Sequence, residues 1–406
     1  MNPADNQLGE LVAKFRRLRG LSQRELGDKL QRSESWVSQV ERGVHRIERL
    51  SMLQALADAL DVPLRDIRPD ANNLTDRAPS ALDDLRLALT GHPALGELLE
   101  DQEPNAETLS LSDLDNDVDR AWTLAHASEF DQLNRLLSDL LPKLEVAARR
   151  TKATKLRRIQ LARARAYQAA AAAFARQDEA DAAWIASDRA IAAAELSGEP
   201  LQVIAGLFRM AHAFLLLSQF GQAEHAAQSA IEVLQPAAEA PKASQELLSI
   251  YGAMHLVRAV IAAREGNRTT AHQQIEQART LAQRLNEDRN DFDTEFGPTN
   301  VELHAMSIAV DLGDAGEAVD IAAEIDPSPL SPERQFRFHL DLARAHAQRR
   351  HAGEATAALL EAEHVAPEQA HSHHVMRTAV RDVLQLAGRS APAELRALGD
   401  RIAATP

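Results

Sequence analysis

The chain has 406 residues and no cysteine, which excludes disulfides, thiolate metal sites and cysteine nucleophiles. Hydrophobic residues make up 45%, enough for a substantial core, and the length suits two or three structural units. Only 4% of residues are aromatic, which favours helices over strands. The net charge of −15 divides into +2 over residues 1–69, −11 over 70–119 and −6 over 120–406. The first segment is therefore the one that is not acidic, as expected of a part that contacts a polyanion.

The sequence lacks the motifs of secreted, membrane and common enzyme classes. The first ten residues lack the apolar stretch of a signal peptide, and the apolar run Ala166–Ala175 is too short to span a bilayer. We therefore expect a cytoplasmic protein without a membrane partner. HExxH, P-loop, GxSxG and GxGxxG motifs are absent, so we expect no enzyme and no cofactor. The histidines His371, His373 and His374 are a candidate metal cluster, but a solvated helix-end cluster is the simpler interpretation.

Residues 21–43 carry the start and stop signals of two short helices. Ser22 followed by Glu25 is a capping box, which predicts a helix directly after Ser22. Ser33 can cap a second helix over Glu34–Arg42, and Gly43 can end it. The inward faces of both helices are apolar, through Leu26, Leu30, Val37 and Val40. Two short helices joined by a tight turn form a helix-turn-helix.

This stretch resembles the phage-repressor and xenobiotic-response-element family of helix-turn-helix regulators. The motif is Gln23-x-x-Leu26, then Ser33-x-x-x-Val37-Ser38-x-x-Glu41-x-Gly43. The likeness continues through a helix over Leu50–Leu60 and a closing segment to Ile67, and covers residues 8–67. It implies a lambda-repressor-like domain over residues 1–68. Gln31 stands where the family usually has glycine in the turn, so we expect a reshaped turn there.

The resemblance implies that the second helix of this motif enters the major groove of double-stranded operator DNA, bound by a homodimer. The residues expected at the DNA are Gln23, Arg24, Ser33, Glu34, Ser35, Ser38, Gln39, Arg42 and Arg46. Among them, Gln39 can pair bidentately with adenine and Glu34 can accept from cytosine N4, while the arginines suit phosphates. Arg16 and Glu41 are expected to form a structural ion pair. Trp36 either packs on the core, which we favour, or lies against the sugar-phosphate backbone.

Residues 69–118 are acidic and contain four prolines, which is typical of a solvated linker. The stretch Ala81–Leu89 is amphipathic and predicts a short linker helix. An alternative role for the acidic residues is competition with DNA for the basic face.

From residue 119 to 406 the sequence repeats a pattern of two helices around a short turn. The predicted turns lie around Asp178, Gly221, Gly266, Gly313 and Gly353. An Ala-rich amphipathic helix follows each turn, over Ala180–Ala194, Ala223–Leu234, Thr270–Leu285, Glu317–Ile325 and Glu354–Val365. Such pairs bury their apolar faces only against neighbouring pairs, so the pattern predicts an α-solenoid. It is similar to tetratricopeptide repeats, although its repeats are longer than the usual ~34 residues.

Polar residues recur in the helices that precede these turns: Arg209, His212, His255, Arg258, Asn300 and His304. The first helices of tetratricopeptide-like pairs line a concave face, where this stripe would suit an anionic small molecule or a peptide carboxylate. The segment Phe296–Val301 (FGPTNV) resembles a motif of bacterial regulators with this two-part build. Pro298 fits a first helical turn, whose free N–H groups can hold an anion. The alternative is a capped helix with a solvated polar stripe.

The sequence thus predicts an all-α regulator: a helix-turn-helix domain, an acidic linker and a tetratricopeptide-like solenoid that dimerises and senses a small ligand or peptide. Its build resembles that of peptide-pheromone-sensing regulators. The alternative is a protein-interaction regulator, in which the repeats bind a protein such as an anti-regulator or toxin and DNA binding is secondary. Pocket shape separates the two, because a closed polar cavity favours a small ligand and an open apolar groove favours a protein.

Overall fold

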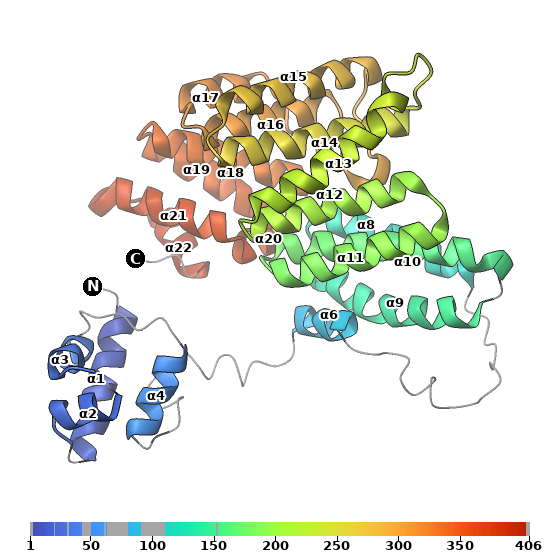
Figure 1. Cartoon of the computed structure of the whole chain (residues 1–406). Coiled ribbons are helices and arrows are strands. Elements are labelled where there is room, and N and C mark those ends of the chain that lie inside the picture. The colour runs from blue at the N-terminus through green and yellow to red at the C-terminus, as the bar shows by residue number, and fades with distance from the viewer. Residues whose placement is uncertain are drawn as a thin grey trace. The chain divides into compact units, whose positions relative to one another are not determined.

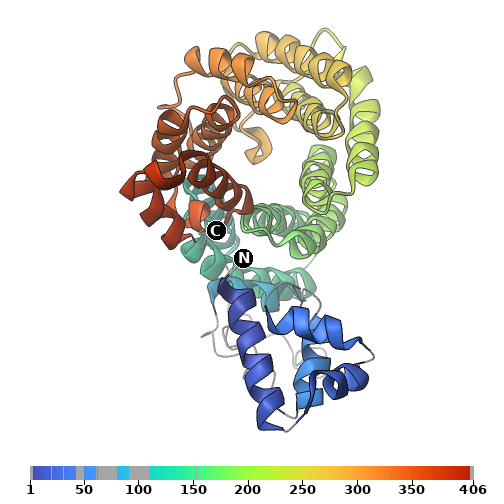
Figure 2. The same ribbon diagram turned by 90° about the vertical axis from the view of Figure 1, so that its left-hand side faces the viewer.

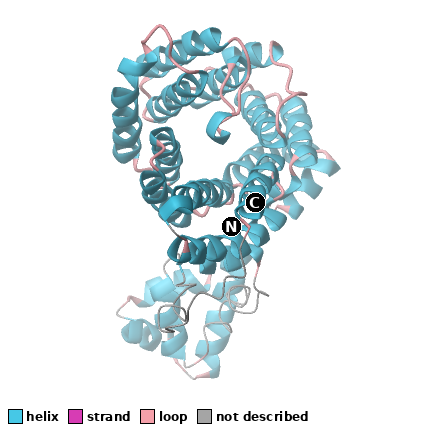
Figure 3. Ribbon diagram, turned by 90° about the vertical axis from the view of Figure 1, so that its right-hand side faces the viewer, coloured by secondary structure: helices cyan, strands magenta, loops and turns pink. Residues whose placement is uncertain are grey.

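In the computed structural model the described residues are 3–19, 21–30, 32–42, 50–60, 62, 80–90, 110–151 and 153–402. These residues form helices joined by turns, with one isolated β-bridge between Arg289 and Phe296 and no strand (Figure 3). The chain divides into two compact units, Met1–Ser80 and Ala81–Thr405. The predicted all-α architecture, a helix-turn-helix domain followed by a helical repeat, is confirmed.

The first unit contains four described helices around one small core. They are α1 (Pro3–Leu18), α2 (Gln23–Leu30), α3 (Glu34–Glu41) and α4 (Leu50–Leu60). The core consists of Val12, Leu26, Leu30, Val37, Val40, Leu56, Ala57 and Leu60. Leu26 and Leu30 lie one turn apart on α2, so the apolar spacing in the sequence becomes a single inward face. The unit therefore has its own hydrophobic core.

The second unit begins earlier than the sequence predicted. Helix α6 (Ala81–Thr90) buries Leu85 and Leu89 in the same cluster as α8 (Leu111–Ala127) and α9 (Phe130–Arg150). Arg86 on α6 also forms an ion pair with Asp181 at 2.8 Å. The helix expected in a linker over residues 69–118 is therefore part of the second unit, and α8 starts eight residues before the expected boundary at 119.

Six helix hairpins make up most of the second unit in the described part of the chain. After α8–α9 they are α10 (Ala153–Arg176) with α11 (Ala180–Ser197), α12 (Pro200–Leu216) with α13 (Phe220–Ala238), α14 (Gln245–Arg264) with α15 (Arg268–Leu285), α16 (Pro298–Asp311) with α17 (Ala315–Ala323), and α18 (Pro332–Gln348) with α19 (Ala352–Val365). The unit ends with α20 (Pro367–Ser372), α21 (His374–Ala387) and α22 (Ala393–Arg401) (Figure 1). The predicted helices after each turn match α11, α13, α15, α17 and α19 to within a few residues.

The turn inside each hairpin contains one residue with left-handed backbone. These residues are Ser128, Asp178, Ser218, Gly266, Gly313 and Arg350, with φ between 56° and 84°. The turns predicted at Asp178, Gly266 and Gly313 are confirmed. The turns predicted at Gly221 and Gly353 are wrong. These glycines lie inside α13 and α19, three residues beyond the observed turns at Ser218 and Arg350. Glycine is the usual residue at positive φ, but here serine and arginine carry that conformation.

The hairpins curve until the last ones meet the first, so that the unit forms a closed ring (Figure 2). At this seam Ser128 Oγ donates to Gln369 Oε1 at 2.7 Å, and the His374 backbone N–H donates to Asp178 at 2.7 Å. The apolar core of the first hairpins and that of α18–α22 are separate clusters. Polar contacts therefore hold much of the seam.

The connection between α15 and α16 enters the ring interior, with a short 3₁₀ turn, η2 (Asp291–Asp293), at its tip (Figure 2). Phe292, Asp293 and Glu295 all have positive φ, a conformation that costs non-glycine residues about 1–3 kcal/mol each. The segment is anchored by Phe296, which is fully buried and packs against Gly252 of α14. A Cβ atom at position 252 would lie 2.0 Å from the Phe296 ring, so glycine is required there.

Helix α14 is long and apolar enough, by length and composition alone, to span a membrane. However, 78% of its apolar window is buried among the other helices of the ring. The helix therefore serves as a core helix in this structure.

Candidate DNA-binding and effector sites

Helices α2 and α3 begin with the caps that the sequence predicted. The Ser22 backbone N–H donates to Glu25 Oε2 at 2.7 Å, and the Glu25 N–H donates to Ser22 Oγ at 3.1 Å. This reciprocal pair is a capping box. Ser33 Oγ accepts from the Trp36 N–H at 3.2 Å and caps α3. Both helix starts are therefore fixed by local hydrogen bonds.

Two glycines allow the close packing of this domain, and sequence reasoning missed both. A Cβ atom on Gly9 would lie 2.6 Å from the Val40 carbonyl oxygen at the end of α3. A Cβ atom on Gly27 would lie 2.7 Å from the Arg32 carbonyl oxygen in the turn. The backbone of α1 thus touches α3, and α2 touches the α2–α3 turn. Only glycine lets these helices approach so closely.

The expected ion pair between α1 and α3 is present. Arg16 Nε donates to Glu41 Oε1 at 2.5 Å, and the Arg16 guanidinium also donates to the Leu21 carbonyl at 2.7 Å. Burial by itself raises the pKa of Glu41, but hydrogen bonds from Arg16 and Gln23 outweigh it and hold this pKa below its ordinary value. The pair fixes the angle between α1 and α3 and is not available to DNA.

The outer face of α3 presents polar side chains, as expected of a recognition helix. Glu34 and Ser35 are exposed, and Ser38 and Gln39 are half-buried. Arg24 and Arg42, predicted to contact phosphates, are exposed, and so is Ser33. Gln23 is placed differently from the prediction: its amide donates to Glu41 Oε2 at 2.7 Å, so in this structure it supports the ion pair.

Trp36 is half-buried against the domain core, and the Arg32 guanidinium lies 5.8 Å from its ring centroid. This placement agrees with core packing, the role we favoured. Gln31, Gly43 and Arg46 lie outside the described residues.

The interior of the ring contains two adjoining cavities, of about 160 and 60 Å³. Four of the six predicted ligand residues line them, namely Arg209 and His212 from α12 and Asn300 and His304 from α16. The other two do not. Arg258 forms an ion pair with Glu224 at 2.6 Å, and the His255 ring bonds the Gln274 side chain at 2.7 Å. The prediction of a polar stripe on α14 is therefore wrong.

The error comes from offsets that agree only approximately: Arg258 lies eight residues before Gly266, whereas His212 lies nine before Gly221 and six before the observed turn at Ser218. The sixth positions before the turns at Ser218, Gly266, Gly313 and Arg350 are His212, Val260, Ser307 and Arg344, and all four line the larger cavity. On α14 the positions equivalent to Arg209 and His212 are Val257 and Val260. Because the side chains of a helix turn by about 100° per residue, His255 and Arg258 face other helices.

Arg209 is the most unusual side chain of this interior. It is 9% exposed, donates to the Asp293 carbonyl at 2.7 Å, and stacks 4.8 Å from the Trp122 ring centroid. No carboxylate of the described residues forms an ion pair with it, and its Nε atom is buried without a hydrogen bond. Burial, and then the nearby Arg176, lower the pKa of Arg209 to about 9, so it stays charged at neutral pH. A buried, unpaired cation is costly.

Asn300, His212 and His304 line the cavities on the same side as Arg209, the wall formed by α12 and α16. Asn300 is 4% exposed and its Oδ1 has no hydrogen-bond partner. His212 Nδ1 lies 2.9 Å from the Phe208 carbonyl, and His304 Nδ1 lies 2.9 Å from the Asn300 carbonyl. Burial lowers the pKa of both histidines to about 3, so they are neutral. The cavities therefore combine a fixed cation with neutral polar groups.

Sequence reasoning missed the opposite wall, which α18 supplies. Arg334, Arg337, Asp341 and Arg344 face the larger cavity at spacings of three, four and three residues. This spacing places charges on one helical face and was visible in the sequence. Arg344 pairs with Asp311 and Asp341, each at 2.7 Å. Arg337 pairs with Glu333 yet keeps 46% of its side chain accessible, so part of its charge faces the cavity.

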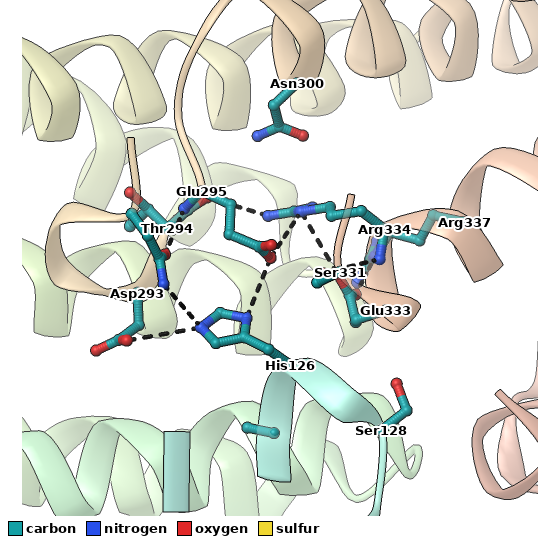
Figure 4. A network of polar contacts seen from close by, with 12 residues as sticks. His126, Ser128, Asp293, Thr294, Glu295, Asn300, Ser331, Glu333, Arg334 and Arg337 are labelled. Carbon is teal, nitrogen blue, oxygen red and sulfur yellow. Dashed lines mark hydrogen bonds and ion pairs between the residues drawn. The ribbon is translucent and has the colours of Figure 1, made fainter. Parts of the chain in front are cut away.

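A polar network ties the inserted loop to α8 and α18 (Figure 4). His126 Nδ1 lies 3.1 Å from Glu295 Oε2, and its Nε2 lies 3.6 Å from Asp293. Arg334 donates to Glu295 at 3.2 Å and to the Thr294 carbonyl at 3.1 Å. Burial lowers the pKa of His126, but hydrogen bonds with the loop carboxylates outweigh it and raise this pKa above its ordinary value. The loop thus links α8 and α18, which contact each other at the seam of the ring.

The FGPTNV segment is capped internally, so the anion predicted at the start of α16 is already supplied by the protein. Pro298 occupies the first turn of α16, as expected. Asp288 accepts from the Thr299 backbone N–H at 3.0 Å and from the Thr299 hydroxyl at 2.6 Å. A carboxylate of the chain therefore occupies the place proposed for a ligand.

The three C-terminal histidines point to different partners. His371 pairs with Glu363 at 3.0 Å, and His374 pairs with Asp178 at 2.7 Å across the seam. His373 is stacked on His374 and packs edge-on against Phe336. Among the residues that the structure describes, no group of three or more such side chains is placed to hold a metal ion.

Residues 7–69 match the helix-turn-helix domain family. The N-terminal unit is a helix-turn-helix domain. With this domain the chain falls in the class of DNA-binding regulators. Among solved structures, the chain is similar to Bacillus thuringiensis PlcR, crystallised in complex with the peptide PapR7 and DNA. The identity is 13%, the TM-score is 0.35, and the match covers 85% of this chain and 98% of that chain. At this TM-score nothing about function follows from the likeness. No curated protein matches the sequence.

Proposed function

We propose that this chain is a cytoplasmic, non-enzymatic transcriptional regulator that binds operator DNA as a homodimer through α3 and receives an effector inside its helical ring. The observation that carries the proposal is the capped α2–α3 pair within a domain-family match, with an exposed polar face on α3. The polar residues on this face are of types that hydrogen-bond base edges in the major groove.

The roles of individual residues follow from their exposure. Glu34, Ser35, Ser38 and Gln39 would read bases, because they lie on the outer side of α3. Arg24, Arg42 and the Ser33 hydroxyl would contact phosphates and set the register. Gln23 would act through Glu41, by holding the carboxylate that fixes α3. The xenobiotic-response-element subfamily remains our assignment for the domain.

The ring supports an effector role better than a protein-docking role. Its cavities are lined by both polar and apolar side chains, and Arg209 Nε and Asn300 Oδ1 are buried there without a hydrogen-bond partner. The described large apolar side chains that are exposed are the scattered Leu87, Trp184, Leu196 and Val233. A protein partner would require a larger contiguous apolar surface. We therefore favour a small ligand or a peptide as effector over a protein partner.

Genome-wide footprinting of the full chain tests this proposal. We expect discrete sites with two half-sites about one helical turn apart, as homodimers of such domains require. A matched control is the Asp28→Asn variant, whose exposed side chain lies on α2 and is not among the proposed DNA contacts. Uniform binding without discrete sites would contradict sequence-specific regulation, and single half-sites would contradict the homodimer.

A further inference from the structure

The side chains that line the ring cavities carry more positive than negative charge. Six arginines line them, Arg176, Arg209, Arg264, Arg334, Arg337 and Arg344. Three carboxylates of the walls face them, Glu333, Asp311 and Asp341, and Glu295 of the inserted loop adds a fourth through Arg334. Asp293 of the same loop, which lies 3.6 Å from His126 and also acts electrostatically on Arg209, adds a fifth, so the arginines still outnumber the carboxylates. An excess of positive charge inside a ring is stabilised when an anion binds there.

The excess is concentrated at two side chains. Arg209 has backbone carbonyls as its hydrogen-bond acceptors, and its Nε atom has no partner. Arg337 shares Glu333 with Arg176 and Arg334 and keeps nearly half of its side chain accessible in the cavity. An acidic ligand placed between α12 and α18 would reach both walls. Guanidinium groups are well suited to carboxylate and phosphate oxygens.

The same cavities also present hydrogen-bond acceptors. A carbonyl oxygen can only accept, so Nδ1 of His212 and of His304 must carry the ring proton. In a neutral imidazole this leaves Nε2 as an acceptor. Asn300 Oδ1 is a third acceptor and is unpartnered. A ligand that satisfies these atoms must donate hydrogen bonds as well as carry negative charge.

The cavities have room for a small molecule. The larger cavity, of about 160 Å³, exceeds many times the ~10–15 Å³ that one water molecule needs. The two cavities share His212, Asn300, His304, Arg334 and Arg337, so they adjoin each other. An open pocket of about 850 Å³ shares Arg344, His374 and Val375 with the larger cavity. A compact molecule with several heavy atoms fits this space.

We propose that the ring binds a small hydroxylated anion, a carboxylate or a phosphate ester, with its acidic group on Arg209 and Arg337 and its hydroxyl groups on Asn300, His212 and His304. This inference rests on the proposed role of the ring as a sensor and specifies the chemistry of its effector. Because the bound anion contacts α12, α16 and α18, it would stabilise the folded ring.

Thermal unfolding and calorimetric titration of the full chain, without DNA, test the proposal. The probes are gluconate and glycerol 3-phosphate, with acetate and glucose as controls, all at equal ionic strength. We expect gluconate or glycerol 3-phosphate to raise the melting temperature by several degrees, and acetate and glucose to change it little. A response to one of the two and not the other identifies the acidic group. No response to either probe, or an equal response to glucose, would overturn the proposal.

Variants test the named residues. Arg337→Gln should lower the affinity about tenfold, the usual worth of one charge-assisted hydrogen bond. Asn300→Asp retains the shape of the side chain but adds a negative charge, so it should abolish binding. Arg349→Gln, at an exposed arginine just after α18, is the matched control and should bind like the wild type. Unchanged binding in both site variants would refute the site. These measurements omit DNA, so they test anion binding by itself. If the anion binds but does not change the affinity for operator DNA in a separate assay, the binding site stands and only the sensor role is contradicted.

Discussion

Glu333 is the carboxylate on which the ring interior depends most. Its side chain is fully buried, forms an ion pair with Arg337, and lies 3.4 Å from Arg176 Nε and 3.5 Å from Arg334 Nε. Burial alone raises the pKa of Glu333, but the three arginines outweigh it and hold this pKa well below its ordinary range. The isosteric change Glu333→Gln removes the charge and keeps the shape.

The expected loss of stability follows from these contacts. Removal of one partner of a buried ion pair costs about 3–5 kcal/mol. Arg337 retains 46% accessibility and can be hydrated, but Arg176 and Arg334 keep only 7% and 11%, so we expect the middle of this range, about 4 kcal/mol. A unit of this size loses roughly 2 °C of melting temperature per kcal/mol, which gives a fall of roughly 8 °C.

Differential scanning calorimetry of the full chain measures this fall, with Glu354→Gln on the exposed face of α19 as the control. The control should stay within about 0.5 kcal/mol of the wild type. Because the folded-state pKa of Glu333 is depressed, its contribution is present above pH ~4.5 and is lost as the pH falls. Glu333→Gln should therefore flatten the acid limb of stability, and it should bind gluconate more tightly than the wild type. A variant as stable as the control, with unchanged anion affinity, would refute this reasoning.

Two further substitutions test the packing and protonation of the ring. Gly252→Ala should destabilise the protein by about 1–3 kcal/mol, because the added methyl group meets the Phe296 ring, whereas Gly221→Ala, in open space on α13, should stabilise it by about 0.5–1 kcal/mol. If urea unfolding gives the same change in stability for both variants, the close contact between position 252 and Phe296 is contradicted. The pKa of His126 is raised in the folded state, so its contribution is complete below pH ~6.5 and is lost as the pH rises through the raised pKa. His126→Asn should remove this loss from the pH profile of the melting temperature, and an unchanged profile would count against the network around Glu295.

The helix-turn-helix was predictable because its determinants are local. A capping box at Ser22 and a cap at Ser33 each act within one turn of helix, and the observed hydrogen bonds are the ones that the spacing predicted. The partner of Gln23 was not predictable in the same way. Its amide bonds Glu41, eighteen positions away, because the fold brings the end of α3 beside the start of α2.

The ring interior was only half predictable. Helix pairing follows from periodicity, but the face that looks inward depends on where each turn lies. Offsets counted back from the predicted turns agreed only to within one or two residues, and each residue turns a helical side chain by about 100°, so the predicted α14 residues faced the wrong side. Closure of the ring and insertion of the loop depend on contacts such as Ser128 with Gln369 and Arg209 with Asp293. Contacts between such distant residues leave no local pattern.

Selection of bound sequences from a random DNA pool, by the full-length wild type and by Gln39→Ala, tests the central claim most directly. We predict that the wild type enriches a two-half-site motif. We predict that the variant loses preference at one base position in each half-site and about 1–3 kcal/mol of affinity. Enrichment of no motif by the wild type, or of an identical motif by both proteins with equal affinity, would contradict sequence reading by α3.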